Sequence, residues 1–429
     1  MEKVVTRFPP SPTGPFHVGN ARTALFNYLF TKQNHGKMLF RLEDTDKERS
    51  KKEYEEDIIE NLKWLGIELD FKNFPRQSER SKIYKKYLQK LLDENKAYLD
   101  EKAVRFKNPN KKIKFEDLIR GEIEFDTSEL EDFVIAKNLD EPLYHLAVVV
   151  DDFEMGVTHV IRGEDHISNT PRQILIQEAI GAPRPIYAHL PLILAQDRSK
   201  LSKRKHGESV SVSFYRKNGY LPEALVNFLA LLGWNPGTKQ EIFSMEELIE
   251  KFDIKKVQKS GAIFNLEKLD WLNKQYIKKI PTKDLAKMLL EYLSEKKPDS
   301  WEKIVELEKD RISKLSDISD IKEGIGYFFE EPVYNSALLI WKDSNKEKTK
   351  IHLEQIVKIL CDIPENNFIK DNIKNAVWDY AEKQGRGNVL WPFRVALSGL
   401  DKSPDPFTLA DILGKIKTIN RLKNALNIC

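Results

Sequence analysis

From the N-terminus to about residue 95, short apolar runs alternate with longer segments in which apolar residues recur at helical spacing. The runs Val4–Phe8 and Met38–Leu42 are predicted strands, and helical periodicity is clearest over residues 21–29, 54–65 and 83–92. Two parallel strands need a long crossover between them, which is usually a helix. The alternation therefore predicts an α/β domain built on a parallel sheet.

The alternation is interrupted once and later gives way to helices. Residues 100–142 are polar and contain Pro109 and Pro142, so they are expected to form a loop-rich insertion. From about residue 281 onwards there is little strand pattern, which predicts a mainly helical C-terminal part. Between these two parts, the predicted elements are strands at 145–150, 157–162 and 186–194 and a helix from 170 to about 180.

Composition excludes several classes of protein. Of the 429 residues, 41% are hydrophobic, which excludes wholesale disorder. No apolar run approaches the ~18 residues of a membrane span, and the N-terminal sequence lacks the apolar core of a signal peptide. The two cysteines, Cys361 and Cys429, exclude a disulfide framework and a cysteine-rich zinc site. We therefore expect a cytoplasmic protein with no membrane partner.

One candidate for a phosphate site lies between the first predicted strand and the first predicted helix. The segment Arg7–Asn20 passes through a proline-rich turn into the helix, whose N-terminus presents free N–H groups and the positive end of its dipole. His17 could donate a hydrogen bond to a phosphoryl group, and Gly19 would let a ligand approach the backbone. A proline-stiffened loop with an ordinary helix cap explains the segment equally well.

A second candidate is a basic segment after the strand predicted at 186–194. Five of the eight residues from Arg198 to Lys205 are basic and none is acidic. Lysine ammonium groups are compact charges on flexible stems, which suits them to a leaving pyrophosphate. By itself, such a segment is more often a solvated loop.

Charged residues also follow two other predicted strands. Glu43–Asp46 comes directly after the second strand, where ligands of open α/β sheets bind, and could hold an ammonium group or a metal ion. A solvated acidic turn is the alternative. Arg162 ends a later strand and suits a bidentate contact with a carboxylate. His145, His159 and His166 fit no tetrahedral metal pattern, so hydrogen-bonding roles are expected for them.

In their order and spacing, these segments resemble the class I aminoacyl-tRNA synthetases, and most closely the bacterial glutamyl-tRNA synthetases. The stretch Phe16–Asn20 is similar to the HIGH signature of that class, with Val for Ile and Asn20 for the final His. Lys200–Arg204 is similar to its KMSKS signature, with Leu for Met and Arg for the last Ser. The resemblance covers essentially the whole chain, and its other motifs read RFPPSPTG, RLEDTD, YHLAVVVDD, HVIRGEDH and WPFRVALSGLDKSPDPFTLADILG.

The resemblance implies two groups of site residues. Within the first group, the resemblance implies that Glu43 receives the ammonium of a glutamate substrate. The charges agree with this, because a dicarboxylate with one ammonium suits two arginines and one carboxylate. The residues of this glutamate pocket would be Arg7, Ser11, Glu43, Tyr144 and Arg162. The second group would bind ATP, and it consists of His17, Gly19, Asn20, Asp165, Lys200 and Lys203. His17 and Lys203 would be the catalytic residues that contact the ATP phosphates, and Mg²⁺ would arrive with the ATP.

The resemblance also implies a fold and a reaction. We expect a Rossmann-type class I catalytic domain with a short insertion, followed by an all-α C-terminal anticodon-binding domain. A glutamate–tRNA ligase of this kind, expected to be a monomer, would use ATP to activate L-glutamate to glutamyl-adenylate and transfer it to the 3′ end of tRNA(Glu). The implied bounds are 1–99 and 144–210 for the two halves of the catalytic domain, 100–143 for the acceptor-stem insertion, 211–280 for a region that contacts the stem, and 281–429 for the anticodon-binding domain.

The sequence departs from the family pattern in the insertion. Many bacterial members carry three cysteines and a histidine there, which bind zinc. Here Leu99–Lys102 runs almost directly into Arg105–Lys107, and no cysteine is present. A shortened insertion without zinc is therefore expected.

Several alternatives stay open from the sequence. The enzyme could charge tRNA(Gln) with glutamate, alone or in addition to tRNA(Glu), or the chain could be a non-catalytic RNA-binding paralogue. A glutamine-specific enzyme fits less well, because Arg7 and Arg162 suit a carboxylate better than an amide. The short relatives that glutamylate a tRNA base lack a counterpart of residues 281–429.

Overall fold

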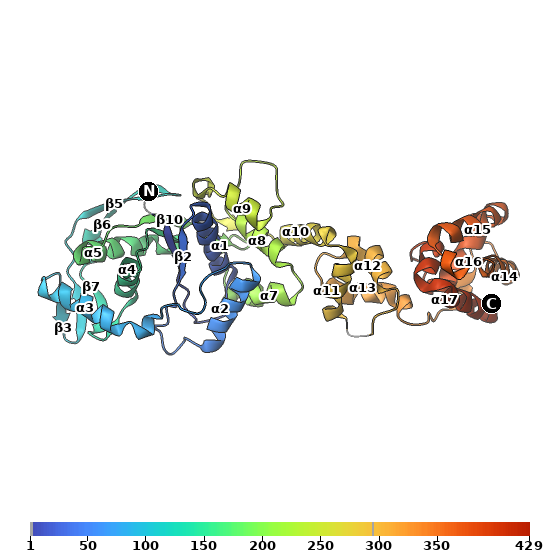
Figure 1. Cartoon of the computed structure of the whole chain (residues 1–429), viewed down its shortest axis with the longest axis horizontal. Helices are drawn as coiled ribbons and strands as arrows, with labels where there is room; N and C mark the ends of the chain where they lie inside the picture. Colours follow the sequence, from blue (N-terminus) through green and yellow to red (C-terminus); the bar gives the residue numbers. More distant parts are fainter. Residues whose placement is uncertain (1–2, 294–295) are drawn as a thin grey trace. The chain divides into compact units, whose positions relative to one another are not determined.

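The chain folds into two compact units, Met1–Tyr276 and Ile277–Cys429, in a computed structural model (Figure 1). The structure describes residues 3–293 and 296–429, apart from the side chains of residues 203, 204, 322 and 323. We call the two units the N-terminal and the C-terminal unit. The domain bounds given above, including the one between 280 and 281, stay predictions.

Parallel strands form the centre of the N-terminal unit. Strand β1 (Val5–Phe8) pairs in parallel with β2 (Lys37–Phe40), and β9 (His159–Gly163) pairs in parallel with β10 (Ile186–Leu190). The Thr158 amide donates to the Val5 carbonyl at 2.9 Å, so β9 begins beside β1. The α/β fold class predicted from the alternating pattern is confirmed, and so are the first two strands to within two residues.

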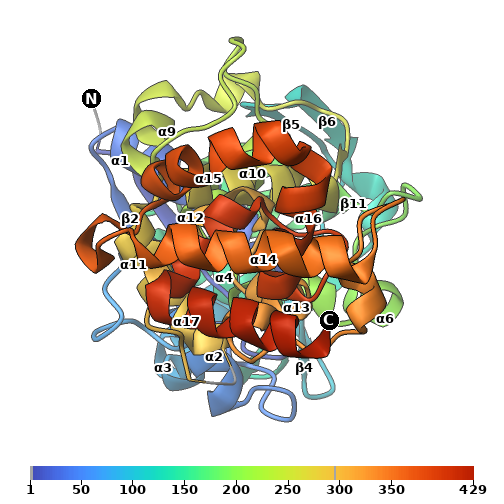
Figure 2. The same ribbon diagram turned by 90° about the vertical axis from the view of Figure 1, so that its right-hand side faces the viewer.

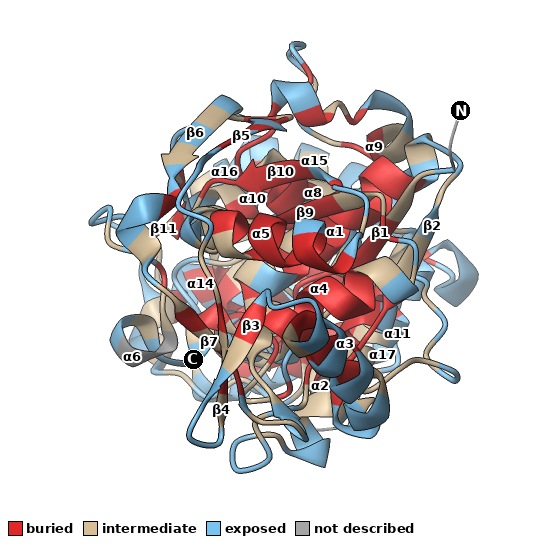
Figure 3. Ribbon diagram, turned by 90° about the vertical axis from the view of Figure 1, so that its left-hand side faces the viewer, coloured by how far each residue is buried: buried red, intermediate tan, exposed pale blue. Residues whose placement is uncertain are grey.

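Helices complete the crossovers and cover the sheet. Helix α1 (Val18–Gln33) connects β1 to β2 and is buried on most of its surface, including the polar residues Arg22, Asn27 and Thr31. Figure 3 shows much of α1, α4 (Tyr144–Glu154) and α5 (Thr170–Ile180) in red, the colour of buried residues. The other helices here are α2 (Lys52–Trp64), α3 (Ser81–Asp93), α6 (Lys203–His206), α7 (Val212–Lys217), α8 (Pro222–Leu231) and α9 (Met245–Lys251). Helix α10 (Leu266–Lys279) begins in this unit and ends beyond its last residue, Tyr276.

The strand predicted at 145–150 is wrong, because this segment lies within helix α4 (Tyr144–Glu154). Residues 146–150 are all at most 2% exposed, so the helix is surrounded by core. A helix buried on all sides needs apolar residues at every position, and such a run has no periodicity to distinguish it from a buried strand. As a consequence, Asp151 and Asp152 lie in the last turns of a helix.

The insertion is rich in strands, so the loop-rich structure expected for residues 100–142 is wrong. Strand β5 (Lys112–Asp117) alternates exposed and buried residues, and its lysines and acids gave the segment a polar composition that hid the alternation. β5 pairs with β10, so the insertion extends the parallel sheet. The other strands of this region are β3 (Ala97–Asp100), β4 (Ala103–Phe106), β6 (Gly121–Asp126), β7 (Phe133–Asn138) and β8 (Glu141–Pro142).

The strand predicted at 186–194 is two strands. After β10, Pro191 cannot donate to a strand partner, and the chain leaves that sheet. It then forms β11 (Ile193–Leu194), which pairs in parallel with β12 (Ala262–Ile263). The basic segment follows β11.

Within its described residues, the C-terminal unit contains helices and no strand, as expected. Trp301 is one of its fully buried side chains, and its Nε1 donates to the Ala286 carbonyl at 2.8 Å. Figure 2 shows α14, α15, α16 and α17 packed against one another in orange and red. The helices are α11 (Thr282–Leu289), α12 (Trp301–Glu308), α13 (Asp317–Ile325), α14 (Lys346–Cys361), α15 (Lys370–Gln384), α16 (Arg386–Ser398) and α17 (Pro406–Ile428). No helix in the described parts of the chain is long and apolar enough to cross a membrane.

Candidate active site

A cavity of about 570 Å³ lies at the carboxyl ends of β1 and β9. Ligands of open α/β sheets bind at this edge. Ten of the eleven site residues predicted from the sequence line the cavity: Arg7, Ser11, His17, Gly19, Asn20, Glu43, Tyr144, Arg162, Asp165 and Lys200. The eleventh is Lys203, whose backbone begins α6 and whose side chain lies outside the described residues.

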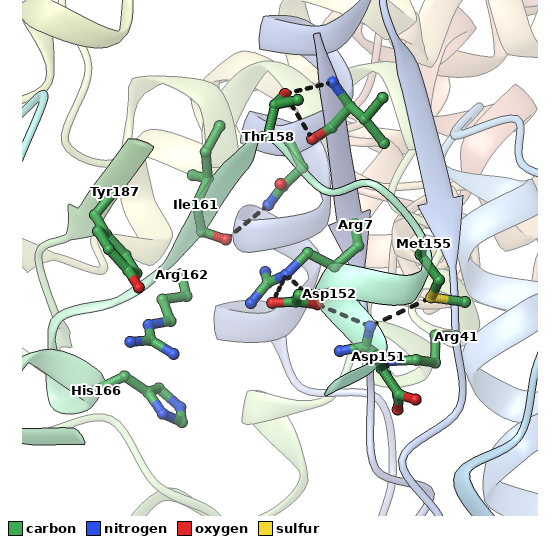
Figure 4. A network of polar contacts seen from close by, with 12 residues as sticks. Arg7, Arg41, Asp151, Asp152, Met155, Thr158, Ile161, Arg162, His166 and Tyr187 are labelled. Carbon is green, nitrogen blue, oxygen red and sulfur yellow. Dashed lines mark hydrogen bonds and ion pairs between the residues drawn. The ribbon is translucent and has the colours of Figure 1, made fainter. Parts of the chain in front are cut away.

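Arg7 projects from β1 and is held by an aspartate of α4. Its Nε donates to the two carboxylate oxygens of Asp152 at 3.3 and 3.2 Å, and its side chain is almost completely buried. Figure 4 shows the terminal nitrogens of Arg7 on the side of Arg162, away from Asp152. Asp152 therefore orients Arg7 through Nε, and the two Nη groups stay available to a ligand.

A second buried arginine, Arg41, holds the carboxylates of the site together. It forms ion pairs with Asp152 at 2.8 Å, Glu43 at 3.0 Å and Asp151 at 3.6 Å, and its side chain is fully buried. Burial alone would lower the pKa of Arg41, but the three carboxylates together raise it above its ordinary value. Arg41 is thus a permanent cation beside Asp152 and Asp151 (Figure 4), and it lies behind Glu43, which lines the cavity.

Asp151 and Asp152 are satisfied almost entirely by side chains. Asp151 accepts from Arg80 at 2.7 Å, from Gln77 at 2.9 Å and from the hydroxyl of Tyr84 at 2.9 Å. Burial would raise the pKa of Asp152, but Arg7 and Arg41 outweigh it and hold that pKa below its ordinary value. Asp152 is therefore a carboxylate at neutral pH.

Glu43 has less positive charge around it than Asp152 has. Its only ion pair among the described residues is with Arg41, and burial raises its pKa despite that partner. Its side chain is 9% exposed and lines the cavity. Glu43 is therefore a buried carboxylate that a further cation would stabilise.

Arg162 lies across the cavity at the end of β9. Its Nε donates to Nε2 of His189 at 3.2 Å and its Nη2 to the Thr170 hydroxyl at 2.9 Å. Burial lowers the pKa of Arg162, but a guanidinium stays protonated at any physiological pH. The Tyr144 hydroxyl, 3.1 Å from Nδ1 of His166, completes this side of the cavity, and burial raises the pKa of Tyr144.

His17 caps the N-terminus of α1 and lines the cavity. The Gly19 amide donates to its Nδ1 at 2.9 Å, so the neutral ring carries its proton on Nε2 and can donate from there. Burial, and next the nearby Lys200, lower the pKa of His17 to about 4. A Cβ at position 19 would lie only 3.1 Å from Nδ1, so glycine allows this close cap.

The basic segment contributes Lys200 to the cavity wall. Its Nζ is 3.1 Å from a carboxylate oxygen of Asp165, and both side chains are about half exposed. A backbone bridge between Leu194 and Lys200 folds the segment back onto β11. An exposed ion pair of this kind is weak and can open for an anion.

No group of three or more histidine, cysteine, aspartate or glutamate side chains able to hold a metal ion occurs among the described residues. The three histidines considered above have other surroundings. Nδ1 of His159 is 2.8 Å from the Thr158 hydroxyl, and Nδ1 of His166 is 3.2 Å from the Asn169 amide. The ring of His145 packs against Phe133 and Tyr144.

Comparison with protein families identifies the chain. The catalytic domain of the class I tRNA synthetases for glutamate (E) and glutamine (Q) matches residues 3–103 and 99–271. The chain belongs to this family. An anticodon-binding domain matches residues 284–426, so the helical C-terminal unit of this class I synthetase has a counterpart in the family as well.

Known relatives of this synthetase match it along its whole length. A glutamate–tRNA ligase of Carboxydothermus hydrogenoformans is 40% identical, with 99% of this chain and 100% of the relative covered. That of Aquifex aeolicus is 41% identical, with 99% of each covered. A solved structure of a glutamate tRNA ligase from Elizabethkingia meningosepticum, in complex with its amino acid, is 33% identical, covers 99% of each chain and superposes with a TM-score of 0.87. The resemblance stated from the motifs is thereby confirmed.

The charge network of this class I synthetase includes residues that the sequence did not single out as site residues. Arg41 stands inside the RLEDTD motif, and Asp151 and Asp152 end YHLAVVVDD. The available signals were their place in these motifs and, for the two aspartates, their position directly after the run predicted as a strand, because their partners lie far away in the chain. Asp117 and His189 stand outside the motifs quoted above, and they become important only through their contacts with Arg162 described below.

Proposed function

We propose that the protein is a glutamate–tRNA ligase that joins L-glutamate to tRNA(Glu), with ATP converted to AMP and pyrophosphate. The observation that carries this proposal is the meeting of Arg7, Arg162 and Glu43 in one cavity. Two cations and one anion complement a molecule that has two carboxylates and one ammonium group. The names of the relatives agree with this substrate.

In the proposed pocket, Glu43 binds the substrate ammonium, and Arg7 and Arg162 bind its carboxylates. The raised pKa of Glu43 supports the first contact, because a bound ammonium would supply the positive charge that Glu43 lacks. Arg7 supports the second, because Asp152 holds only its Nε. Ser11 and Tyr144 are proposed to complete the pocket through their hydroxyl groups.

ATP is proposed to bind across the N-terminus of α1 and the basic segment. His17 would donate from Nε2 to a phosphate, and Gly19 and Asn20 would contact ATP at the helix start, where N–H groups and the dipole favour anions. Lys200 and Lys203 would meet the phosphates, and Asp165 would lie near the adenosine. Mg²⁺ bound to the ATP would supply further neutralisation of phosphate charge. Six residues are assigned here: His17, Gly19, Asn20, Asp165, Lys200 and Lys203.

The reaction proposed has two steps. A carboxylate oxygen of glutamate attacks the α-phosphorus of ATP, and the bond to pyrophosphate breaks. A hydroxyl of the terminal adenosine of tRNA then attacks the carbonyl of the adenylate, and AMP leaves. The protein contributes orientation of the reactants and stabilisation of developing phosphoryl charge. We also propose that the enzyme works as a cytoplasmic monomer.

Charging of purified tRNA species with labelled glutamate tests the function. The proposal predicts ATP-dependent, acid-precipitable label on tRNA(Glu), and none when labelled glutamine replaces glutamate. Label on tRNA(Gln) as well would show a non-discriminating enzyme. No label on any tRNA, together with no glutamate-dependent exchange of pyrophosphate into ATP in the presence of tRNA, would overturn the proposal in favour of an RNA-binding paralogue.

Replacing Lys203 with alanine is predicted to slow adenylate formation about 100-fold. Removal of one group that stabilises transition-state charge costs ~10²–10³-fold, and a lysine on a flexible stem is less preorganised than a backbone donor, so we expect the low end. Pyrophosphate exchange measures the rate, and the KM for glutamate should change little. Lys205→Ala is the matched control from the same segment, and equal rates for the two variants would contradict the role of Lys203.

A further inference from the structure

A series of buried, hydrogen-bonded side chains connects the insertion to Arg162. Nδ1 of His189 donates to Asp117 at 2.7 Å, and Nε2 of His189 accepts from Nε of Arg162 at 3.2 Å. Thr170 accepts from Nη2 of Arg162 at 2.9 Å. All four residues are at most 6% exposed, so solvent has little access to these contacts.

The hydrogen-bond directions in this series fit only one form of His189. An arginine has no acceptor, so Nε2 of His189 must offer its lone pair, and the neutral ring then carries its proton on Nδ1, toward Asp117. Burial, the largest effect, lowers the pKa of His189, and this outweighs the opposing effect of Asp117. Asp117 is fixed in turn, because it accepts from the amides of Ile119 and Arg120 at 2.9 Å and from that of His189 at 3.0 Å.

Arg162 is held in a different way from the other two arginines of the site. Arg7 and Arg41 form ion pairs with carboxylates, whereas Arg162 has no ion pair among the described residues. A buried guanidinium without an anion is costly. His189 and Thr170 accept its hydrogen bonds without cancelling its charge, so the full charge stays available to an anionic ligand.

The outermost residue of this series comes from the insertion. Asp117 ends β5 and is paired with Tyr187 of β10, which brings it beside His189 two residues further along that strand. The turn after β5 makes a second contact near the cavity, because Arg120 forms an ion pair with Glu164. Glu164 stands between Gly163 and Asp165, which line the cavity. The Leu192 amide donates to Glu164 at 2.6 Å.

We propose that Asp117, His189 and Thr170 are positioning residues. They hold the guanidinium of Arg162 in the orientation that binds a carboxylate of the substrate, and they leave its positive charge without an ion-pair partner. The inference rests on the proposed function, because it assigns the ligand of Arg162 within that reaction. According to this inference, the inserted hairpin contributes to amino-acid binding through Asp117, in addition to the residues that touch the substrate.

Two substitutions of His189 test this assignment. His189→Leu removes the acceptor for Arg162, and His189→Gln restores one, because the glutamine carbonyl oxygen reaches about as far as Nε2. We expect His189→Leu to raise the KM for glutamate about 10- to 100-fold, the size expected for a hydrogen bond to a charged group. The KM for ATP and kcat at saturating glutamate should change less than about threefold, because the contact is equal in ground and transition states. His189→Gln should recover most of the affinity.

Two further variants separate positioning from folding. Thr170→Val keeps the shape of the side chain but removes the hydroxyl that accepts from Nη2 of Arg162 and donates to the His166 carbonyl at 3.1 Å. It should also raise the glutamate KM while the KM for ATP stays near normal, and it decides the matter if His189→Leu does not fold. Tyr187→Phe is the matched control, because in the described part of the chain its hydroxyl donates only to Gln177 and its ring is kept. We expect normal kinetics for it.

The outcomes distinguish the inference from the proposed function. A wild-type protein that charges no tRNA with glutamate contradicts the function itself. A wild-type protein that does so, together with His189→Leu and Thr170→Val variants whose glutamate KM is normal, overturns the inference. Equal losses in both KM values and in kcat, with no recovery in His189→Gln, would show a merely structural role and overturn it as well.

Discussion

Replacing Asp152 with alanine is expected to lower the free energy of unfolding of the N-terminal unit by about 3–5 kcal/mol. Asp152 is the shared partner of Arg7 and Arg41, and all three side chains are nearly or completely buried. Removing the carboxylate leaves two buried cations with too little negative charge, whereas the lost attraction itself is only part of the cost. Hydrogen exchange of the amides of β1 and α4, followed by mass spectrometry, measures the change in this unit alone.

An exposed pair of the same chemistry provides the control. Asp46 forms an ion pair with Arg49 at 2.6 Å, but the two side chains are 38% and 72% exposed. Asp46→Ala should therefore destabilise the protein far less than Asp152→Ala, because solvent screens an exposed ion pair. Similar protection losses in the two variants would mean that the buried network contributes no more than a surface pair.

The pH dependence of stability gives a second measure of Asp152. Although burial acts to raise its pKa, Arg7 and Arg41 hold it below the ordinary value, so unfolding raises it. The ion pairs of Asp152 thus stabilise the protein above about pH 4, the usual aspartate pKa, and this part is lost as the pH falls through the lowered value. Asp152→Ala should remove that part of the acid sensitivity, and an unchanged acid transition would contradict the assignment.

The sequence alone located the cavity residues better than it located their supports. Polar residues that follow strands of a parallel sheet share one edge, so Glu43 and Arg162 could be assigned to one place before any contact was known, and the family resemblance added Arg7 to them. Asp152 follows the strand predicted at 145–150, but its role could not be assigned, because its partners Arg7 and Arg41 are 145 and 111 positions away. Whether the run before it was a strand or a helix could not be decided from periodicity, and that choice determines which way Asp152 points.

The insertion shows a second limit of sequence reasoning. The charged faces of β5 and β6 lowered the apparent hydrophobicity of the hairpin, so its strands were not recognised. Asp117 therefore looked like one more solvated acid in a polar segment. Its contact with His189 spans 72 positions and depends on the pairing of β5 with β10, which local sequence patterns do not encode.

Replacing His17 with asparagine is expected to lower the rate of pyrophosphate exchange about 10²–10³-fold without weakening the fold. His17 has two separable roles, because Nδ1 caps α1 and Nε2 carries the proton proposed to contact a phosphate. Asparagine is among the best N-cap residues, and its carbonyl oxygen can accept from Gly19 as Nδ1 does. It has no donor where Nε2–H lies, so only the proposed catalytic contact is lost.

The control for His17 is a variant that should lower stability and leave the exchange rate unchanged. Ser244 caps α9 by accepting from the Glu247 amide, and it lies outside the residues that line the cavity. Ser244→Ala should cost about 0.5–2 kcal/mol of stability and leave the exchange rate normal.

Since the pKa of His17 is lowered to about 4, the ring is neutral in the folded protein at any pH from 6 to 8. The ratio of wild-type to His17→Asn rates should therefore stay constant across this range. A ratio that changes tenfold between pH 6 and pH 8 would show that the protonated ring acts in the reaction, and a ratio near one at every pH would remove His17 from it.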